Sequence, residues 1–184
     1  MNSLLEILGA SVIGSLVILA LITSLFTASD ANFSLERELT VQKFTSVVAD
    51  IIDADLGKCG LGVGDSTSAI VTADSTQLLF LTDIDGNDTI DSVHYYIQPG
   101  TDVHGNAITV LKRRVSADAG DGASLGTITI HFTFFDAAGN ETAEAGSIKS
   151  VETRLMLRDY IENNGEYAHG FIQWRRHLKN IKNV

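Results

Sequence analysis

Cysteine and cationic residues are scarce in this chain of 184 residues. The single cysteine, Cys59, excludes an intramolecular disulfide, so composition gives no sign of an oxidising compartment and nothing against one. Thirteen lysines and arginines stand against 23 acidic residues, a formal net charge of -10. That balance argues against general nucleic-acid binding, which needs a cationic surface. The late cations are more typical of a solvated terminus than of a docking site: Arg175, Arg176, Lys179 and Lys182.

Catalytic motifs are also missing from the sequence. It contains no G-x-S-x-G motif, no P-loop and no dinucleotide fingerprint. The five histidines show no zinc-type spacing with one another or with Cys59, and nothing singles out a Cys–His nucleophile. We expect His131 to be a surface or edge residue of a strand, and Cys59, beside Gly57 and Gly60, to be a small semi-buried residue. The sequence therefore predicts a chain that is not an enzyme.

The first 28 residues are dominated by one long apolar run. Residues 4–26 read LLEILGASVIGSLVILALITSLF, and 23 helical residues span about 34 Å, enough for a bilayer core of ~30 Å. A cleaved signal peptide is the alternative, but no lysine or arginine precedes the run and its apolar core is too long. We therefore predict an uncleaved helix over residues 1–28 that crosses a membrane or lies in a filament core.

One charge and several small residues mark this apolar helix. Glu6 is costly in apolar surroundings, so it needs a partner or a protonation role, unless its side chain reaches the headgroup region. Gly9, Ala10 and Gly14 are small, and the four-residue spacing of Ala10 and Gly14 lets helices approach closely in lipid. By itself this spacing is a weak signal. Glu6, Gly9, Ala10 and Gly14 are the candidate assembly residues.

The helix is expected to continue through residues 29–57 as an amphipathic segment, because no helix breaker occurs before Gly57. Acids and bases occupy one side, whereas the i, i+3, i+4 pattern places apolar side chains on the other. Gly57 and Gly60 then supply a stop. We predict that this apolar stripe packs on the head: Phe44, Val47, Val48, Ile51, Ile52 and Leu56.

A β-rich head is predicted over residues 58–184. β-branched and aromatic runs between Gly, Asp and Asn clusters indicate strands at 69–72, 77–82, 90–98, 107–115, 127–135 and 148–158. Ile128, Ile130, Phe132 and Phe134 share one strand face, and a turn follows at 136–140. Residues 116–126 indicate a mobile loop, and residues 159–184 give no clear pattern. The fold class is thus α+β, a long N-terminal helix packed on an antiparallel sheet.

One acidic loop, residues 83–91, has the composition of a cation site. Its oxygen-bearing residues match the first, third, fifth, seventh and ninth places of an EF-hand loop: Asp83, Asp85, Asn87, Thr89 (through its backbone carbonyl) and Asp91. Asp88 stands where that loop wants glycine, His94 stands where it wants a bidentate glutamate, and no helix pair flanks it. The alternatives are an acidic hairpin turn and a calcium site, since hard cations prefer oxygen ligands.

Three stretches of the sequence together resemble a known family. The segment SLLEILGASVIGSLVILALITSLF is similar to the N-terminal stretch of type IV pilins and type II secretion pseudopilins. The span 33–59, followed by a Gly-rich turn, resembles PilW-like minor pilins and J-type pseudopilins, and TFFDAAGN followed by IKSVETRLMLR resembles the last strands of PilW-like heads. The family places its glutamate one residue nearer the chain start, a spacing that processing before Asn2 would restore. Many major pilins carry a proline in the span, whereas no proline interrupts it here, and Gly14 is the expected site of local helix melting in a filament.

The resemblance implies a structural subunit of a type IV pilus-like or pseudopilus filament. It implies insertion in the inner membrane, recognition by prepilin peptidase and the pilus assembly machinery, and assembly with identical or related subunits into an extracellular or periplasmic helical filament. In such a filament Glu6 would neutralise the N-terminal amine of a neighbouring subunit. Both a major and a minor subunit are compatible with the resemblance. The alternative is a signal-anchored extracytoplasmic binding or adhesion module that displays the acidic loop.

Overall fold

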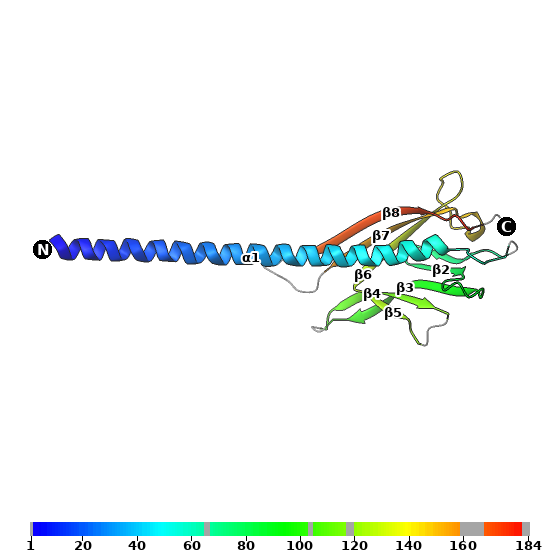
Figure 1. The fold of residues 1–184 in the computed structure, drawn as a ribbon, viewed down its shortest axis with the longest axis horizontal. Coiled ribbons are helices and arrows are strands. Elements are labelled where there is room, and N and C mark those ends of the chain that lie inside the picture. Colours follow the sequence, from blue (N-terminus) through cyan, green and yellow to red (C-terminus); the bar gives the residue numbers. More distant parts are fainter. Residues whose placement is uncertain (1, 65–66, 103–104, 117–119, 159–167, 182–184) are drawn as a thin grey trace. The chain divides into compact units, whose positions relative to one another are not determined.

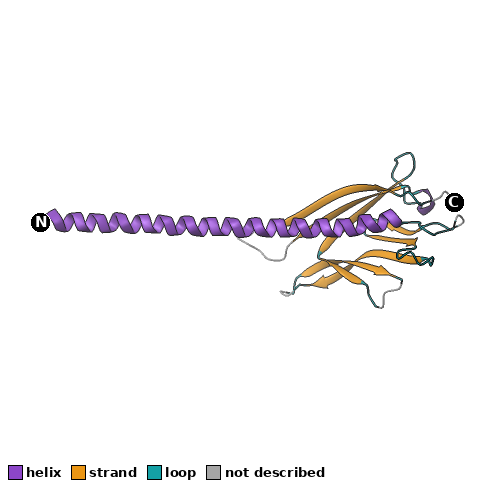
Figure 2. Cartoon of the chain, in the orientation of Figure 1, coloured by secondary structure: helices purple, strands orange, loops and turns teal. Residues whose placement is uncertain are grey.

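The computed structural model describes residues 2–64, 67–102, 105–116, 120–158 and 168–181. The chain divides into two compact units, Met1–Leu39 and Thr40–Val184. One helix, α1 (Asn2–Lys58), supplies the first unit and the first 19 residues of the second, whereas every described strand belongs to the second (Figure 2). The predicted continuation of the helix past residue 28 is confirmed, and its end lies one residue beyond Gly57.

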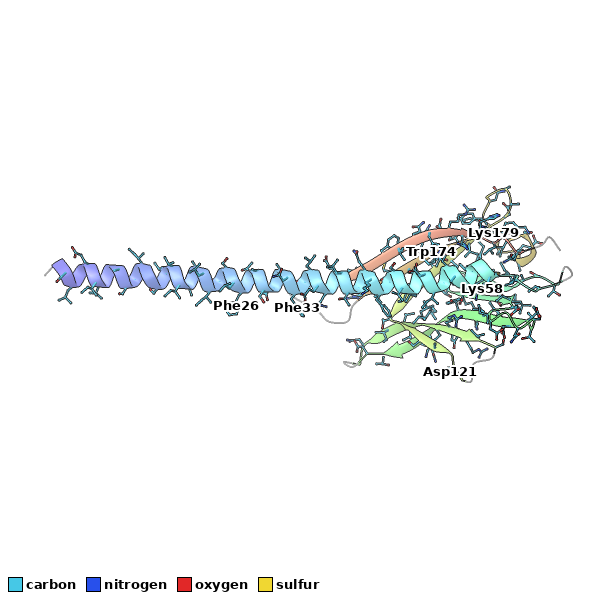
Figure 3. The ribbon with its side chains drawn as sticks, in the orientation of Figure 1. Phe26, Phe33, Lys58, Asp121, Trp174 and Lys179 are labelled. Carbon is cyan, nitrogen blue, oxygen red and sulfur yellow. The ribbon has the colours of Figure 1, made fainter. Side chains whose placement is uncertain are left out.

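The first unit is an α-helix with an uncovered apolar surface. Every described large hydrophobic side chain from Leu4 to Leu39 is between 45% and 71% exposed. Figure 3 shows these side chains, Phe26 and Phe33 among them, projecting from the helix. In the described part of the chain this is the one helix long and apolar enough to cross a membrane, with a mean hydropathy of 2.3 in its most apolar window.

The second unit combines the end of α1 with two antiparallel sheets (Figure 1). The five-stranded sheet A has the order β1-β2-β3-β4-β5, and the three-stranded sheet B has the order β6-β7-β8. A backbone hydrogen bond of 2.8 Å from Phe132 to the carbonyl of Ser75 joins them. The strands are β1 (Ile70–Asp74), β2 (Gln77–Thr82), β3 (Asp91–Thr101), β4 (Ala107–Val115), β5 (Ala123–Gly126), β6 (Ile128–Phe135), β7 (Ser150–Arg158) and β8 (His169–His177), with a short 3₁₀ turn, η1, at Ala145–Ser147.

This architecture confirms the α+β class and all six strands that the sequence predicts, with small differences at their ends. The alternation in β6 is also confirmed, because its four inward residues, Ile128, Ile130, Phe132 and Phe134, are buried while His131 between them is exposed. The turn after β6 is held by Asp136, whose carboxylate accepts hydrogen bonds from the backbone of Ala138 and Asn140.

Two strands were not predicted. The expected loop at 116–126 is wrong in part, because β5 pairs with β4 inside it; residues 117–119 lie outside the described residues. β8 lies in the stretch 159–184 that showed no clear pattern, of which 159–167 and 182–184 are outside the described residues. Arg175 and Arg176 therefore do not form a free basic terminus: they belong to β8 and bind other side chains, although Arg175 is exposed to solvent as expected.

The helix meets the sheets with only part of the predicted stripe. Its core-facing residues in the second unit are Val41, Thr45, Val48, Ala49, Ile52, Asp55 and Leu56. Val48, Ile52 and Leu56 of the predicted stripe are buried, but Phe44 and Val47 are 43% and 47% exposed and Ile51 is only partly buried. The stripe prediction is therefore wrong for Val47. It is met in part for Ile51 and for Phe44, whose ring would lie 2.9 Å from a Cβ added to Gly126 of β5. Apolar side chains occur on both sides of this helix, and the periodicity alone does not choose between them.

A glycine in β8 sets how closely the helix approaches sheet B. A Cβ added to Gly170 would lie 2.2 Å from Thr45 Oγ1 and 3.1 Å from the carbonyl oxygen of Val41. The Thr45 hydroxyl is itself held by a 2.8 Å hydrogen bond to that carbonyl. A side chain at position 170 would therefore meet helix backbone, which cannot move aside as a side-chain tip can.

A buried polar network fastens the helix to sheet A. Asp55, 7% exposed, accepts a 2.5 Å hydrogen bond from the hydroxyl of Tyr95 on β3 and bonds of 2.7 and 3.2 Å from the guanidinium of Arg113 on β4. Burial and the neighbouring Asp55 charge raise the pKa of Tyr95 well above its ordinary value, so the phenol stays protonated and donates. The carboxylate is thus buried with both oxygens satisfied.

A second carboxylate fastens the same helix to sheet B. Asp53 accepts a 3.1 Å hydrogen bond from the indole nitrogen of Trp174 and a 3.0 Å bond from Arg176, both on β8. Asp53 and Asp55 are two residues apart, and about 100° of helix rotation per residue directs them to opposite flanks of the buried face. The helix is therefore held from both sides in its last two turns.

Replacement of Asp55 by alanine is expected to lower the free energy of unfolding of the second unit by about 2–3 kcal/mol, because Arg113 and the Tyr95 hydroxyl lose their buried partner. Chemical denaturation of the full chain in detergent, followed by the fluorescence of Trp174, the single tryptophan, measures the change. Asp50→Ala is the control, since Asp50 is an exposed acid on the same helix. Equal stability of the two variants contradicts the assignment.

Candidate functional site

Hydroxyl groups on the apolar helix of the first unit bond within the helix. Ser11 and Ser15 donate to the carbonyls of Leu8 and Val12 at 2.9 and 2.8 Å. In the same way Thr23 donates to Leu19 at 2.9 Å, and Thr27 donates to the carbonyl of Thr23 at 3.0 Å. These four side chains therefore need no water, which suits a helix surrounded by lipid or by other apolar helices.

The candidate assembly residues occupy the exposed surface near the start of α1. Glu6, Ala10 and Gly14 follow at four-residue spacing, so they lie on one side of the helix, with Gly9 about 60° away from Glu6. All four are exposed. A Cβ added to Gly9 or Gly14 would meet nothing within 4 Å, so both glycines leave the helix backbone open to close approach from outside.

A second stretch of small residues lies further along the same helix and was not predicted. A shallow groove on the helix surface is lined by Leu16, Leu19, Ala20, Thr23, Ser24, Thr27, Ala28 and Ala31. Six of these eight residues are small or hydroxyl-bearing. The four-residue spacing of Ala20, Ser24 and Ala28 is the sequence signal that could have found it. The helix thus offers close approach over more of its length than the predicted residues alone provide.

The acidic loop joins β2 to β3, which pair antiparallel up to Thr82 and Asp91. It brings carboxylate oxygens of Asp83, Asp85 and Asp91 within 4.8 Å of one another. Asp83 is buried and accepts the backbone N–H groups of Gly86, Asn87 and Asp88 at 2.7, 3.1 and 3.0 Å. One carboxylate therefore organises the whole turn.

The other predicted ligands are committed to partners inside the loop or beside it. Asn87 directs its amide nitrogen to Asp85, at 2.9 Å, and its oxygen accepts hydrogen bonds from the backbone and hydroxyl of Thr89. Asp91 accepts a 2.8 Å bond from the hydroxyl of Ser116. Asn87 and Thr89 therefore bind each other, whereas the three aspartates converge.

Asp88 adopts the backbone conformation that its position demands. Its φ of 62° is the only positive value among the described non-glycine residues, and Gly86 nearby has a φ of 78°. The sequence placed Asp88 where an EF-hand loop turns sharply on a glycine, and the chain does turn there. The hairpin connection is confirmed, and the N–H and O–H donors around the aspartates account for their convergence. Calcium binding by this loop stays a prediction.

The cysteine and the described histidines do not come together in one site. Cys59 is buried at 1% exposure, more completely than predicted, and burial raises the pKa of its thiol to about 12, so the reactive thiolate is suppressed. His131 is exposed on β6, an edge strand, as expected, and His94 stacks against Tyr96 on β3. His104 lies outside the described residues. Within the described ranges, the three aspartates of the loop are the one group of histidine, cysteine or acidic side chains placed to share a metal ion.

Comparisons of the chain with protein-family models, with curated proteins and with solved structures found no match. Its function is therefore inferred from the uncovered helix and the head themselves.

Asp83 should make the head sensitive to acid. Burial raises the pKa of Asp83, but the N–H groups of Asp88, Gly86 and Asn87 outweigh burial and leave the pKa below its ordinary value. A lowered pKa in the folded state stabilises the fold above about pH 4, and this contribution disappears as the pH falls through the folded-state pKa. Asp83→Asn is therefore expected to melt at a lower temperature at pH 7, and the gap to the wild type should narrow below about pH 4.

Thermal melts of both chains between pH 3 and 7 measure this gap, with the exposed helix residue substitution Asp50→Asn as the control for loss of one charge. A gap that stays constant over the whole range rules out the role assigned to Asp83.

Proposed function

We propose that the chain is a structural subunit of a type IV pilus-like or pseudopilus filament, assembled through its N-terminal helix. The observation that supports this most directly is the apolar surface of residues 4–39, where every described large hydrophobic side chain is exposed, on a helix whose C-terminal turns belong to the core of a folded head. The segment that resembles the pilin N-terminus is this same helix. A membrane covers such a surface before assembly, and neighbouring helices cover it in a filament.

Glu6 supplies the register in this proposal. A carboxylate on an apolar helix is costly unless it meets a cation, and the N-terminal amine of a neighbouring subunit is the cation that the resemblance implies. Because Ala10 and Gly14 lie on the same side as Glu6, that side can also receive a helix at short distance. The Glu6–amine pair and the close contact at Ala10 and Gly14 would then bind the same neighbouring subunit.

Such a subunit would pass through the inner membrane before it reaches its filament. The subunit is held in the inner membrane by α1, is processed by a prepilin peptidase and is delivered by the assembly machinery to an extracellular or periplasmic filament. Its partners are identical or related subunits. The head then lies outside the membrane, where its charged surface meets water.

Glu6→Ala is expected to reduce filament yield by roughly tenfold or more, because the amine of the neighbour loses its partner in apolar surroundings. The yield is measured by sedimentation and electron microscopy of the full chain, in a host that assembles the wild type. Glu38→Ala, which removes an exposed acid from the same helix, should leave the yield unchanged. Circular dichroism should show the same head fold in both variants. A wild-type filament yield from Glu6→Ala contradicts the proposal.

A membrane-anchored binding or adhesion module is the second candidate function, favoured by the convergence of Asp83, Asp85 and Asp91 in one loop. In that case α1 is only an anchor, Glu6 is incidental, and the loop presents its carboxylates to a calcium ion or a partner. Each subunit would then act alone.

The two candidates differ in what the purified full chain does. The module should stay monomeric when detergent is diluted, and calcium should raise its unfolding temperature relative to a chelator, whereas the filament subunit should form fibres. Asp85→Asn is the matched variant, since it removes one carboxylate of the three and should abolish any calcium effect. An unfolding temperature that calcium and chelator leave equal removes the calcium site.

A further inference from the structure

A polar hollow of about 430 Å³ lies on sheet B, on the face that does not pack against the core. Its walls are the turn after β6, the first residue of β7 and the last residues of β8. Asp136, Ser150, Arg175 and His177 line it together with the small residues 137–139. Neither the acidic loop nor α1 contributes to this hollow, so it is separate from the candidate sites described above.

The guanidinium of Arg175 is held in one position above this hollow. It lies over the ring of Phe135, with Cζ 3.7 Å from the ring centroid. Its Nε and Nη2 atoms donate to Ser150 Oγ at 2.9 and 2.8 Å. These contacts occupy one face and one edge of the guanidinium, whereas the two N–H groups of Nη1 have no partner among the described residues.

Arg175 also has no ion pair within the described part of the chain. Glu152 is its direct neighbour in the strand register, but that carboxylate binds Arg154 at 2.8 Å. Asp136 is the acid in the lining of the hollow, and its carboxylate accepts hydrogen bonds from the backbone and side-chain N–H groups of Asn140. The backbone N–H of Asn140 lowers the pKa of Asp136 more than burial raises it, so Asp136 stays ionised and holds the turn.

The hydroxyl of Ser150 has a proton without an acceptor. Ser150 is only 4% exposed. Because its oxygen accepts two N–H groups from Arg175, both lone pairs are used and its own O–H must point away from the guanidinium. No described residue accepts that proton. A buried donor without an acceptor is unfavourable, so an acceptor bound in the hollow would satisfy it.

We propose that the hollow binds a carboxylate, which accepts the free N–H groups of Arg175 and the O–H of Ser150. The polar groups that lack a partner here are donors, so the ligand must be an acceptor. A guanidinium held in one plane presents parallel N–H groups that match the two oxygens of a carboxylate. His177 is exposed at the rim and can donate one ring N–H to the same ligand.

The charges of the lining favour a ligand with a single negative charge. The positive charge of Arg175 is matched by the negative charge of Asp136, so a doubly charged phosphate would be repelled more strongly than a carboxylate. The carboxylate can belong to a small free acid or to an acidic side chain of a second copy, since the chain has 23 acidic residues. This inference goes beyond the proposed filament function and does not depend on it, because the hollow lies in the second unit.

Titration of the full chain in detergent with sodium acetate tests the site. Sodium chloride and sodium phosphate at equal ionic strength are the comparison salts. The backbone N–H signals of Ala137 and Gly139, followed by NMR, report on the wall of the hollow. We expect these signals to shift saturably with acetate and to shift little with chloride or phosphate.

Two substitutions separate the site from general charge effects. Arg175→Lys keeps the charge but loses the planar donors, so it should weaken acetate binding at least roughly tenfold. Ser150→Ala removes the buried donor and should weaken it roughly threefold or more. Arg154→Lys is the matched control, since Arg154 is an arginine of the same sheet face that pairs with Glu152, and it should leave acetate binding unchanged. The fluorescence of Trp174 shows whether each variant is folded.

The protein concentration identifies the source of the carboxylate. Shifts of the same signals when the chain is concentrated without acetate show that a second copy supplies it, whereas signals independent of protein concentration show a free acid. Three results overturn the inference: acetate, chloride and phosphate shift the signals equally; Arg154→Lys and Arg175→Lys weaken binding equally; or the wild-type signals respond neither to acetate nor to protein concentration.

Discussion

The head depends on two carboxylates near the end of one helix. Asp55 is buried against sheet A through Tyr95 and Arg113, and Asp53 binds Trp174 and Arg176 of sheet B. Because they are two residues apart, the two side chains leave opposite flanks of the buried helix face. Hydrophobic burial supplies most of the favourable free energy, but it has no direction. The two carboxylates bind particular side chains in each sheet and so favour one orientation of the helix, the buried Asp55 more strongly than the half-exposed Asp53.

The contrast between undirected hydrophobic burial and specific side-chain pairs explains which features the sequence could predict. A long apolar run without a helix breaker predicts a helix, and alternating β-branched residues predict strands. For this reason α1, β6 and most other strands were predictable from the sequence. The buried face of the helix was not, since its side carries Thr45, Ala49 and Asp55 while Phe44 and Val47 remain outside. A buried carboxylate is favourable only with partners, and Arg113 is 58 residues away in sequence. β8 was not predicted for the same reason: its arginines look like a solvated terminus until the fold brings Asp53 beside Arg176 and Ser150 beside Arg175.

In the acidic loop, too, local sequence patterns could be predicted and side-chain partners could not. Its oxygen-bearing residues and its turn at Asp88 were predictable from spacing, because the pattern is local. The commitment of Asn87 to Thr89, and of Asp91 to Ser116, was not, because side-chain partners depend on the turn that brings them together. The helix, by contrast, needs no tertiary partner to define its apolar surface. That surface suits apolar surroundings, whereas the exposed acids and bases of the head suit water.

The hydrogen bonds from Trp174 and Arg176 to Asp53 also affect the order in which the head can form. Trp174 and Arg176 are 121 and 123 residues away from Asp53 along the chain. Contacts between such distant residues form slowly, because a long loop must close before they contribute any free energy. A chain synthesised from its N-terminus presents the helix first and β8 late, so the inward face of α1 stays without sheet B for most of synthesis. The apolar segment of α1 is thus complete, and free to meet apolar surroundings, well before sheet B can close the head.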